Sequence, residues 1–176
     1  MTCIRPARYQ ETIISKDIIS NNLKLTKNRS GIGNFRFVDF WIEDKNGNKI
    51  EFSETGKKVT LVFAYTCENP KIINNVDVGF GINNRDDSPL SILYSSYMGK
   101  YYDKLGLKGE IRFCIDNLPF AKGKYRIGVR ALVNGIEADW PRLGIGILDV
   151  EGSNFYERMD KVPDDIAPVL LSGKWS

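Results

Sequence analysis

The 176-residue sequence contains no histidine and only three cysteines. Without histidine, Ser-His-Asp and Cys-His catalytic groups are excluded, and so are histidine metal ligands. The cysteines, Cys3, Cys67 and Cys114, are odd in number and have no Cys-x-x-Cys spacing, which argues against a disulfide framework and against a zinc site. We therefore expect free thiols in a reducing compartment, and neither a metal nor a cofactor.

The sequence also lacks long apolar runs and a strong charge of one sign. No apolar run approaches the roughly 18 residues of a membrane-spanning helix, and no signal-peptide core follows Met1. Residues 1–30 carry six basic and two acidic side chains, whereas residues 31–176 carry nineteen basic and twenty acidic ones. A nearly neutral body argues against nucleic-acid binding. We expect a cytoplasmic protein without direct membrane insertion.

The clearest periodic segment is 118–134. A turn containing Pro119 and Gly123 precedes it, and apolar side chains then occupy every second position of the chain. They are Tyr125, Ile127, Val129, Ala131 and Val133. Lys124, Arg126, Gly128 and Arg130 alternate with them. Period two predicts a strand with one buried and one solvated face, and its length indicates a central position in a sheet.

A second strand is predicted over residues 35–42, with an irregularity inside it. Phe35 and Phe37 share one parity, while Phe40 and Ile42 share the other. A β-bulge near residues 38–39 reconciles the two sets. Asn46-Gly47 then indicates a hairpin turn. Residues 44–48 are also faintly similar to a calcium loop, but the bidentate glutamate is missing, so we favour the turn.

Further short strands are predicted at 59–65, 76–82, 90–97, 110–116, 136–140 and 143–148. Their regular spacing, with turn residues between them and no amphipathic helix, predicts an all-β antiparallel β-sandwich. Its core is predicted to contain Phe63, Phe80, Phe113, Tyr125, Ile127 and Val129. Residues 1–30 are predicted to be a linker from an upstream part, and residues 31–176 the folded domain. The apolar run 168–175 is predicted to be a terminal strand.

Glycines and arginines gather on the solvent-facing parity of the predicted strands. The glycines are Gly79, Gly81, Gly128, Gly144 and Gly146. Glycine within a strand marks a place where something approaches the backbone closely, so neighbouring strands of this kind would form a shallow trough. The predicted site residues are Asn83, Tyr94, Tyr97, Tyr101, Arg112, Arg126, Gly128 and Arg130.

Such a trough suits a sugar chain, because aromatic faces stack on C–H surfaces and Arg and Asn hydrogen-bond hydroxyl groups. The alternative is that the glycines make room for side chains of a packed loop, a helix or a second subunit. A third hypothesis is a glycan-acting enzyme that uses Asp86-Asp87 or Asp164-Asp165. We disfavour it because adjacent residues on a strand point apart and the sequence lacks convergent titratable groups.

The order of these signals resembles the C-terminal carbohydrate-binding domain of Wzt-type ATPases, which belong to ABC transporters that export O-antigen polysaccharide. The matching features are Gly31-x-Gly33 before the first long strand, Asn46-Gly47, the 76–82 strand, residues 118–125, which look like the family's Leu-Pro-Leu-x-x-Gly-x-Tyr, and residues 168–175, similar to its terminal apolar strand and tryptophan. The resemblance covers about residues 29–176.

The resemblance implies an immunoglobulin-like β-sandwich, for which a jelly-roll-like arrangement is the alternative. It implies a non-catalytic module that binds the non-reducing end of the O-antigen glycan of lipopolysaccharide. It also implies a homodimer, with exchange of the C-terminal strand as one arrangement. The upstream part would be a nucleotide-binding domain that meets the transporter's membrane subunit, at the cytoplasmic side of the inner membrane. This chain has no Walker motif of its own.

Overall fold

The computed structural model describes residues 28–69, 73–152, 155–156 and 167–175, and these contain strands and one short 3₁₀ helix but no α-helix. The strands are β1 (Arg29–Ser30), β2 (Phe35–Glu43), β3 (Lys49–Ile50), β4 (Ser53–Glu54), β5 (Val59–Cys67), β6 (Val76–Asn83), β7 (Pro89–Tyr94), β8 (Lys108–Ile115), β9 (Gly123–Val133), β10 (Ile136–Pro141) and β11 (Gly146–Glu151). The 3₁₀ helix, η2 (Ser95–Met98), follows β7.

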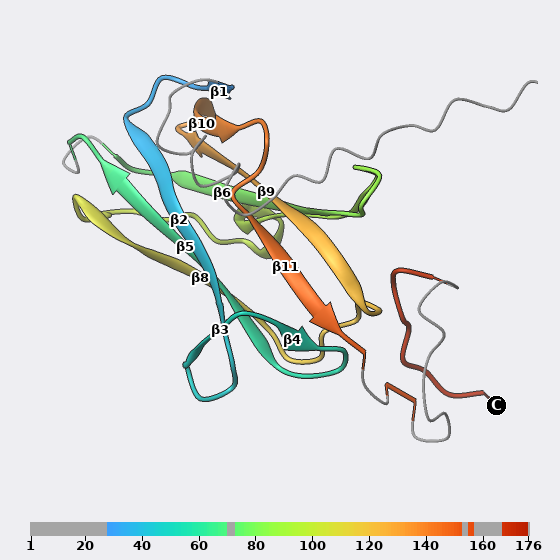
Figure 1. Cartoon of the computed structure of the whole chain (residues 1–176). Coiled ribbons are helices and arrows are strands. Elements are labelled where there is room, and N and C mark those ends of the chain that lie inside the picture. The colour runs from blue at the N-terminus through green and yellow to red at the C-terminus, as the bar shows by residue number, and fades with distance from the viewer. Residues whose placement is uncertain (1–27, 70–72, 153–154, 157–166, 176) are drawn as a thin grey trace, which may run out of the picture.

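The strands form a four-stranded and a seven-stranded sheet. The first has the order β3-β2-β5-β8, and the second contains β1, β10, β9, β11 and β4, with β6 and β7 added beside β9. Figure 1 shows β2, β5 and β8 in one layer and β9 and β11 in the layer that faces it. Neighbouring strands are antiparallel, apart from the short parallel pair of β11 and β4. The predicted all-β sandwich is confirmed.

Strand β9 is the centre of the seven-stranded sheet, as its length and periodicity predict. One of its edges pairs with β6 over residues 126–133. The other edge is shared, because β11 pairs with residues 123–127 and β10 with residues 131–133. Residues 128–130 therefore have no ladder partner on that edge of the described sheet. The chain that connects β10 to β11 passes this gap.

The predicted β-bulge is present in β2. The register of β2 against β5 shifts between Phe37 and Asp39, so that Phe35, Phe37 and Ile42 are all buried. The hairpin turn is also confirmed. The backbone N–H of Gly47 donates to the carbonyl oxygen of Asp44, and the Asp44 carboxylate accepts from the N–H of Asn48 at 2.8 Å. This carboxylate thus serves as a turn cap.

Aromatic side chains from the two sheets meet in the core. The rings of Phe63 and Phe80 stack at 5.7 Å, and those of Phe80 and Phe113 lie 4.9 Å apart. The predicted core residues are buried except Phe113, which is partly buried because β8 is the edge strand of its sheet. Burial on the inner faces stabilises the sandwich by roughly 25 cal/mol per Å² of apolar surface.

Two predictions about the later part of the chain are wrong. The strand predicted at 143–148 begins only at Gly146, because Gly144 has a positive φ of 86° and turns the chain. The turn changes the parity, so Gly146 faces the core against the ring of Phe40 and does not belong to the trough. The run 168–175 forms an isolated bridge from Val169 to Phe120 instead of a strand.

The end of the predicted linker is tied to the sandwich. β1 pairs with β10, and the Arg29 Nε and Asp139 Oδ1 atoms lie 2.5 Å apart with almost no solvent exposure. The second Asp139 oxygen accepts from the backbone N–H of Phe37 at 2.8 Å. A buried carboxylate requires such partners, since an unpaired buried charge is strongly destabilising. Residues 1–27 lie outside the described residues.

Two further features bear on function. Within the described ranges, no helix is long and apolar enough to cross a membrane. Nor do the described Cys, Asp and Glu side chains form a group of three that would hold a metal ion. Cys67 is a buried free thiol and Cys114 an exposed one, whereas Cys3 and Asp164-Asp165 lie outside the described residues.

Candidate functional site: a glycine-floored trough

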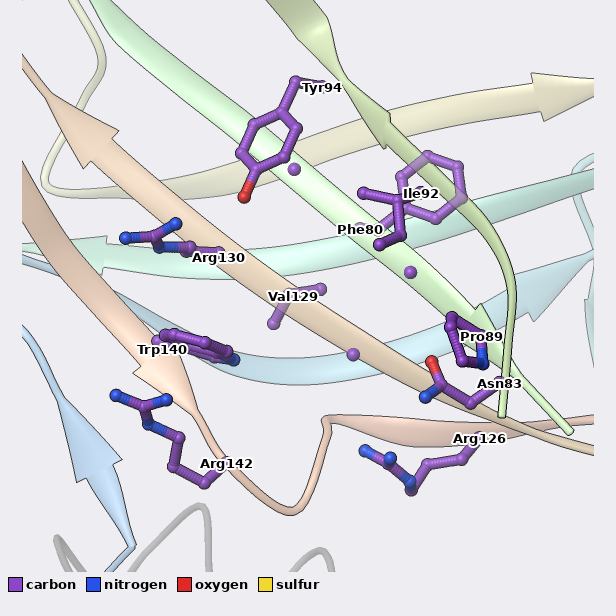
Figure 2. Close-up of a pocket in the computed structure, with 13 residues that line it drawn as sticks. Phe80, Asn83, Pro89, Ile92, Tyr94, Arg126, Val129, Arg130, Trp140 and Arg142 are labelled. Carbon is purple, nitrogen blue, oxygen red and sulfur yellow. The ribbon is translucent and has the colours of Figure 1, made fainter. Parts of the chain in front are cut away.

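A pocket of about 340 Å³ lies on the outer face of the seven-stranded sheet. We call it the trough and define it by the residues that line it. They are Gly79, Phe80, Gly81, Asn83, Pro89, Ile92, Tyr94, Arg126, Gly128, Val129, Arg130, Trp140 and Arg142. Figure 2 shows the labelled lining residues on β6, β7, β9 and β10, with Arg142 just after β10.

The floor of the trough is low because glycines lie side by side on adjacent strands. Gly81 of β6 is opposite Gly128 of β9, and Gly79 is opposite Arg130. A Cβ atom added at Gly128 would have no heavy atom within 4 Å, so the space above it is open. Since β6 and β9 are neighbours in register, the predicted glycine floor exists for these strands.

Strand β7 forms one wall of the trough. Ile92 pairs with Gly81, and Tyr94 pairs with Gly79. The Tyr94 ring lies directly over Gly79, where a Cβ atom would come within 2.4 Å of the ring. Glycine at this position is therefore required for the tyrosine to lie flat. The ring and the exposed Ile92 side chain provide an apolar surface.

Asn83 and Arg126 mark one end of the trough. They are opposite each other on β6 and β9, and both bind Asp87 of the turn between β6 and β7. The Arg126 Nε donates to the Asp87 carboxylate at 2.8 Å, and the Asn83 amide donates to the Asp87 carbonyl oxygen at 3.0 Å. The turn thereby holds both side chains in place. Asp87 is thus an ion-pair partner of Arg126.

The opposite wall consists of an arginine–tryptophan–arginine stack. The guanidinium of Arg142 lies 3.5 Å from the centre of the Trp140 ring, and that of Arg130 lies 4.9 Å from it. Figure 2 shows Trp140 edge-on, with the two guanidinium groups on its two sides. Cation–π attraction and planar stacking favour this geometry. Both faces of the indole are covered, so Tyr94 is left as the stacking platform.

Ser30 and Glu137 hold this stack from behind. The Ser30 hydroxyl donates to Glu137 Oε1 at 2.5 Å and accepts from the Arg142 Nη2 at 3.1 Å. Glu137 Oε2 also lies 2.7 Å from the Arg130 Nη2. The hydrogen bond from Ser30, with those from Arg130, holds the pKa of Glu137 below its ordinary value. The carboxylate therefore stays charged, binds Arg130 directly, and is linked to Arg142 through the Ser30 hydroxyl.

The structure brings some of the predicted site residues together and separates others. Those that line the trough are Asn83, Tyr94, Arg126, Gly128 and Arg130. Tyr97, in η2, is exposed and its ring lies 5.4 Å from that of Tyr94, but it does not line the trough. Tyr101 is exposed in the loop after η2, also outside the lining.

The placement of Arg112 beside Arg126 and Arg130 is wrong. Arg112 lies on β8, in the four-stranded sheet, while the other two lie on β9 of the seven-stranded sheet. Its guanidinium binds Glu43 and Glu110. Parity assigns a residue to a face of its own sheet, but it does not say which sheet the strand joins.

Four lining residues were not predicted as site residues from the sequence: Trp140, Arg142 and the β7 wall residues Pro89 and Ile92. Trp140 lies near the end of the predicted 136–140 strand, and Pro141-Arg142 follows. The signal was an aromatic and a basic residue beside a strand-ending proline. This signal does not predict a site unless it is known that the segment around Trp140 and Arg142 lies beside the unpaired edge of β9.

The sequence matches the family model of the Wzt C-terminal domain over residues 26–140. The chain belongs to the Wzt C-terminal domain family. At the level of the family, this supports a non-catalytic module with a carbohydrate-binding role in O-antigen export. No curated protein matches the chain by sequence.

A solved structure shows the same fold. The crystal structure of the C-terminal domain of Wzt is similar with a TM-score of 0.63 and 17% identity, over 84% of this chain and 86% of that one. At this identity the similarity shows the shared fold. A β-glucuronidase of Parabacteroides merdae reaches a TM-score of 0.40 at 14% identity, over 66% of this chain and 13% of its own, which is too weak to carry an argument.

Proposed function

We propose that the trough binds the O-antigen glycan of lipopolysaccharide for export by an ABC transporter. The observation that carries the proposal is the open glycine floor between the Tyr94 wall and the arginine stack. A sugar ring is polar around its rim and presents C–H groups on its faces. Gly81 and Gly128 leave room for such a ring, and the tyrosine face suits its C–H surface.

The polar groups around the floor suit sugar hydroxyls. Sugars lose hydrogen bonds to water on binding, and protein donors and acceptors must replace these bonds. Asn83 supplies both a donor and an acceptor, and Arg126 supplies fixed donors. Because a few anchors carry most of the binding energy, single substitutions should have large effects.

Calorimetry of the folded chain with the O-polysaccharide of its host tests the proposal. Arg126→Ala should weaken binding by about tenfold, since a hydrogen bond to a charged group contributes roughly 1.5–3 kcal/mol. Arg112→Ala is the matched control, because it removes the same charge from the other sheet, and it should bind like the parent. The proposal is wrong if Arg126→Ala binds as tightly as Arg112→Ala.

We further propose that the recognised part is the non-reducing end of the polymer, as the family resemblance implies. A short oligosaccharide that carries this end should compete with the whole polysaccharide at equal molar concentration of ends. An oligosaccharide from the chain interior should not compete. Equal competition by both would mean that internal units are bound instead.

The remaining parts of the proposal concern assembly. Residues 1–30 would join this domain to a nucleotide-binding ATPase domain, which meets the membrane subunit at the cytoplasmic side of the inner membrane. Pull-down of the membrane subunit by a longer chain that includes the ATPase domain, but not by residues 28–176 alone, is the expected result.

We also propose a homodimer that depends on the last ten residues. Leu170 is buried, yet Leu171 and Trp175 are strongly exposed. Large apolar side chains left in water favour association with a second copy. Deletion of the residues after Asp165 should give monomer or aggregate in sedimentation. A stable dimer of the shortened chain would place the interface elsewhere.

The second candidate function is a protein-interaction sandwich in which the trough is a subunit contact. The exposed apolar side chains of Ile92, Tyr97 and Met98 on and beside the β7 wall favour this alternative. It predicts that Ile92→Asp alters the sedimentation coefficient. Glycan binding with unchanged sedimentation would decide against it.

A further inference from the structure

The charged groups that line the trough are all cations. Arg126, Arg130 and Arg142 line it, and none of the described aspartates and glutamates does. A guanidinium group donates hydrogen bonds and accepts none, whereas a neutral sugar hydroxyl both donates and accepts. A ligand made only of hydroxyl groups would therefore find few acceptors here. Oxygen atoms that carry negative charge would match this lining better.

Two of these arginines already have a carboxylate partner behind the trough. Arg126 is paired with Asp87, and Arg130 with Glu137. Arg142 differs, because none of the described carboxylates lies within salt-bridge distance of it, and the Ser30 hydroxyl is its hydrogen-bond partner. Arg142 thus brings to the trough a positive charge without a directly paired carboxylate.

The stack on Trp140 holds two like charges near each other. Arg130 and Arg142 lie on the two sides of one indole ring (Figure 2). Like charges repel, and the energy falls when an anion approaches both. A carboxylate or phosphate also accepts two parallel hydrogen bonds from one guanidinium, so its geometry fits the planar fork.

We infer that the sugar unit held in the trough carries an anionic group, a carboxylate or a phosphate, which Arg142 binds together with Arg130. This inference rests on the proposed glycan-binding function and specifies the chemistry of the bound unit. The Tyr94 ring and the glycine floor hold the sugar ring, and the stack holds the charge.

The test is a titration of the ¹⁵N-labelled chain, followed by the amide resonances of Gly81 and Gly128. The probes are glucuronic acid, glucose 6-phosphate, glucose and inorganic phosphate. At least one sugar-borne anion should bind about tenfold or more tightly than glucose, in line with hydrogen bonds to charged groups. It should also bind more tightly than inorganic phosphate. Raising salt from about 50 to about 500 mM should reduce this preference.

Substitutions then assign the preference to the stack. Arg142→Ala should bring the anionic sugar to within about twofold of glucose, and Arg142→Gln serves as a second variant if the first does not fold. Arg85→Ala is the matched control, since it removes an exposed arginine from the adjacent turn outside the lining. It should keep the preference.

The outcomes separate this inference from the proposed function. If glucose binds as tightly as both anionic sugars, or if Arg142→Ala keeps the preference, the inference is wrong while glycan binding stands. If inorganic phosphate binds as tightly as glucose 6-phosphate and glucuronic acid, the trough is a small-anion site and the inference is wrong. If neither these sugars nor the O-polysaccharide shifts a trough resonance, both proposals are rejected.

Discussion

The outer faces of the two sheets carry similar side chains in different surroundings. On the four-stranded sheet, the Trp41 indole donates to Glu43 at 2.8 Å, and Arg112 binds both Glu43 and Glu110. On the seven-stranded sheet, Trp140 is stacked between Arg130 and Arg142, with Glu137 behind. On the four-stranded sheet, Arg112 thus binds two carboxylates. On the seven-stranded sheet, Arg142 has no directly paired carboxylate among the described residues.

The floors of the two faces differ as well. Thr60, Val62, Ala64 and Thr66 alternate along β5 on the outer side of its sheet. Their side chains cover the backbone, whereas Gly79, Gly81 and Gly128 leave it low. β-Branched residues favour strands and glycine weakens them. The glycine floor of the trough therefore lowers the stability of its sheet, whereas the outer face of the four-stranded sheet has no such cost. Both faces carry arginine and tryptophan side chains, but a recess forms only where small residues lie in register on neighbouring strands.

The largest expected effect distinguishes the buried Arg29–Asp139 ion pair, which contacts β2 from β1 and β10, from the exposed Arg112 pair on the outer face of the four-stranded sheet. Asp139→Asn removes the partner of Arg29, whose side chain is only 4% exposed, and should cost about 3–5 kcal/mol of unfolding free energy. Glu43→Gln removes a partner of Arg112, whose side chain is 47% exposed, and should cost about 1 kcal/mol or less. Urea denaturation measures both. Equal losses of unfolding free energy in the two variants would contradict the expected difference between the buried and the exposed pair.

The next effect is on glycan binding. Gly128→Val adds a side chain to open space and should weaken binding of the host polysaccharide by more than about tenfold, which is 1.4 kcal/mol, with the fold retained. Thr66→Val on the other face is the matched control and should bind like the parent. Calorimetry of the folded variants distinguishes them, and parent-like affinity of Gly128→Val would mean that the trough is not the site.

A smaller effect is expected at the edge of the trough. Ser30→Ala removes the hydroxyl that links Glu137 to Arg142 and should weaken glycan binding by about threefold to tenfold, since a hydrogen bond contributes roughly 0.5–1.5 kcal/mol. Ser53→Ala in β4, outside the trough lining, is a control. Unchanged affinity of Ser30→Ala would show that β1 does not position the stack.

The smallest effects concern acid titration. Hydrogen bonds from Arg112 and Trp41 lower the pKa of Glu43 from its ordinary value of 4.5, and hydrogen bonds from Ser30 and Arg130 lower that of Glu137. A lowered folded-state pKa stabilises above pH 4.5, and this contribution is lost as the pH falls through the folded-state pKa.

Carboxyl ¹³C titration by NMR measures these two values separately. Arg112→Ala should raise the pKa of Glu43 toward 4.5 and leave that of Glu137 unchanged. Ser30→Ala should raise the pKa of Glu137 and leave that of Glu43 unchanged. A shift of both glutamates in either variant would mean that the faces are electrostatically coupled.

The local sequence pattern predicts the strands, the bulge in β2 and the buried faces of this fold. The alternation along 123–133 places Tyr125, Ile127 and Val129 in the core, and the parity change after Phe37 predicts the bulge in β2. These features follow from the two-residue period of a strand, which acts between near neighbours in sequence. The glycines of β6 and β9 were recognised as a floor for the same reason.

Which strands share a sheet depends on long-range packing that the sequence pattern does not contain. Arg112 has the predicted parity but lies on β8 in the other layer, and a positive φ at Gly144 turns Gly146 into the core. Trp140 near the end of β10 and Arg142 just after it reach the trough because β10 and β11 share one edge of β9. Pairing between distant segments depends on the packing of the whole chain, and no local period encodes it.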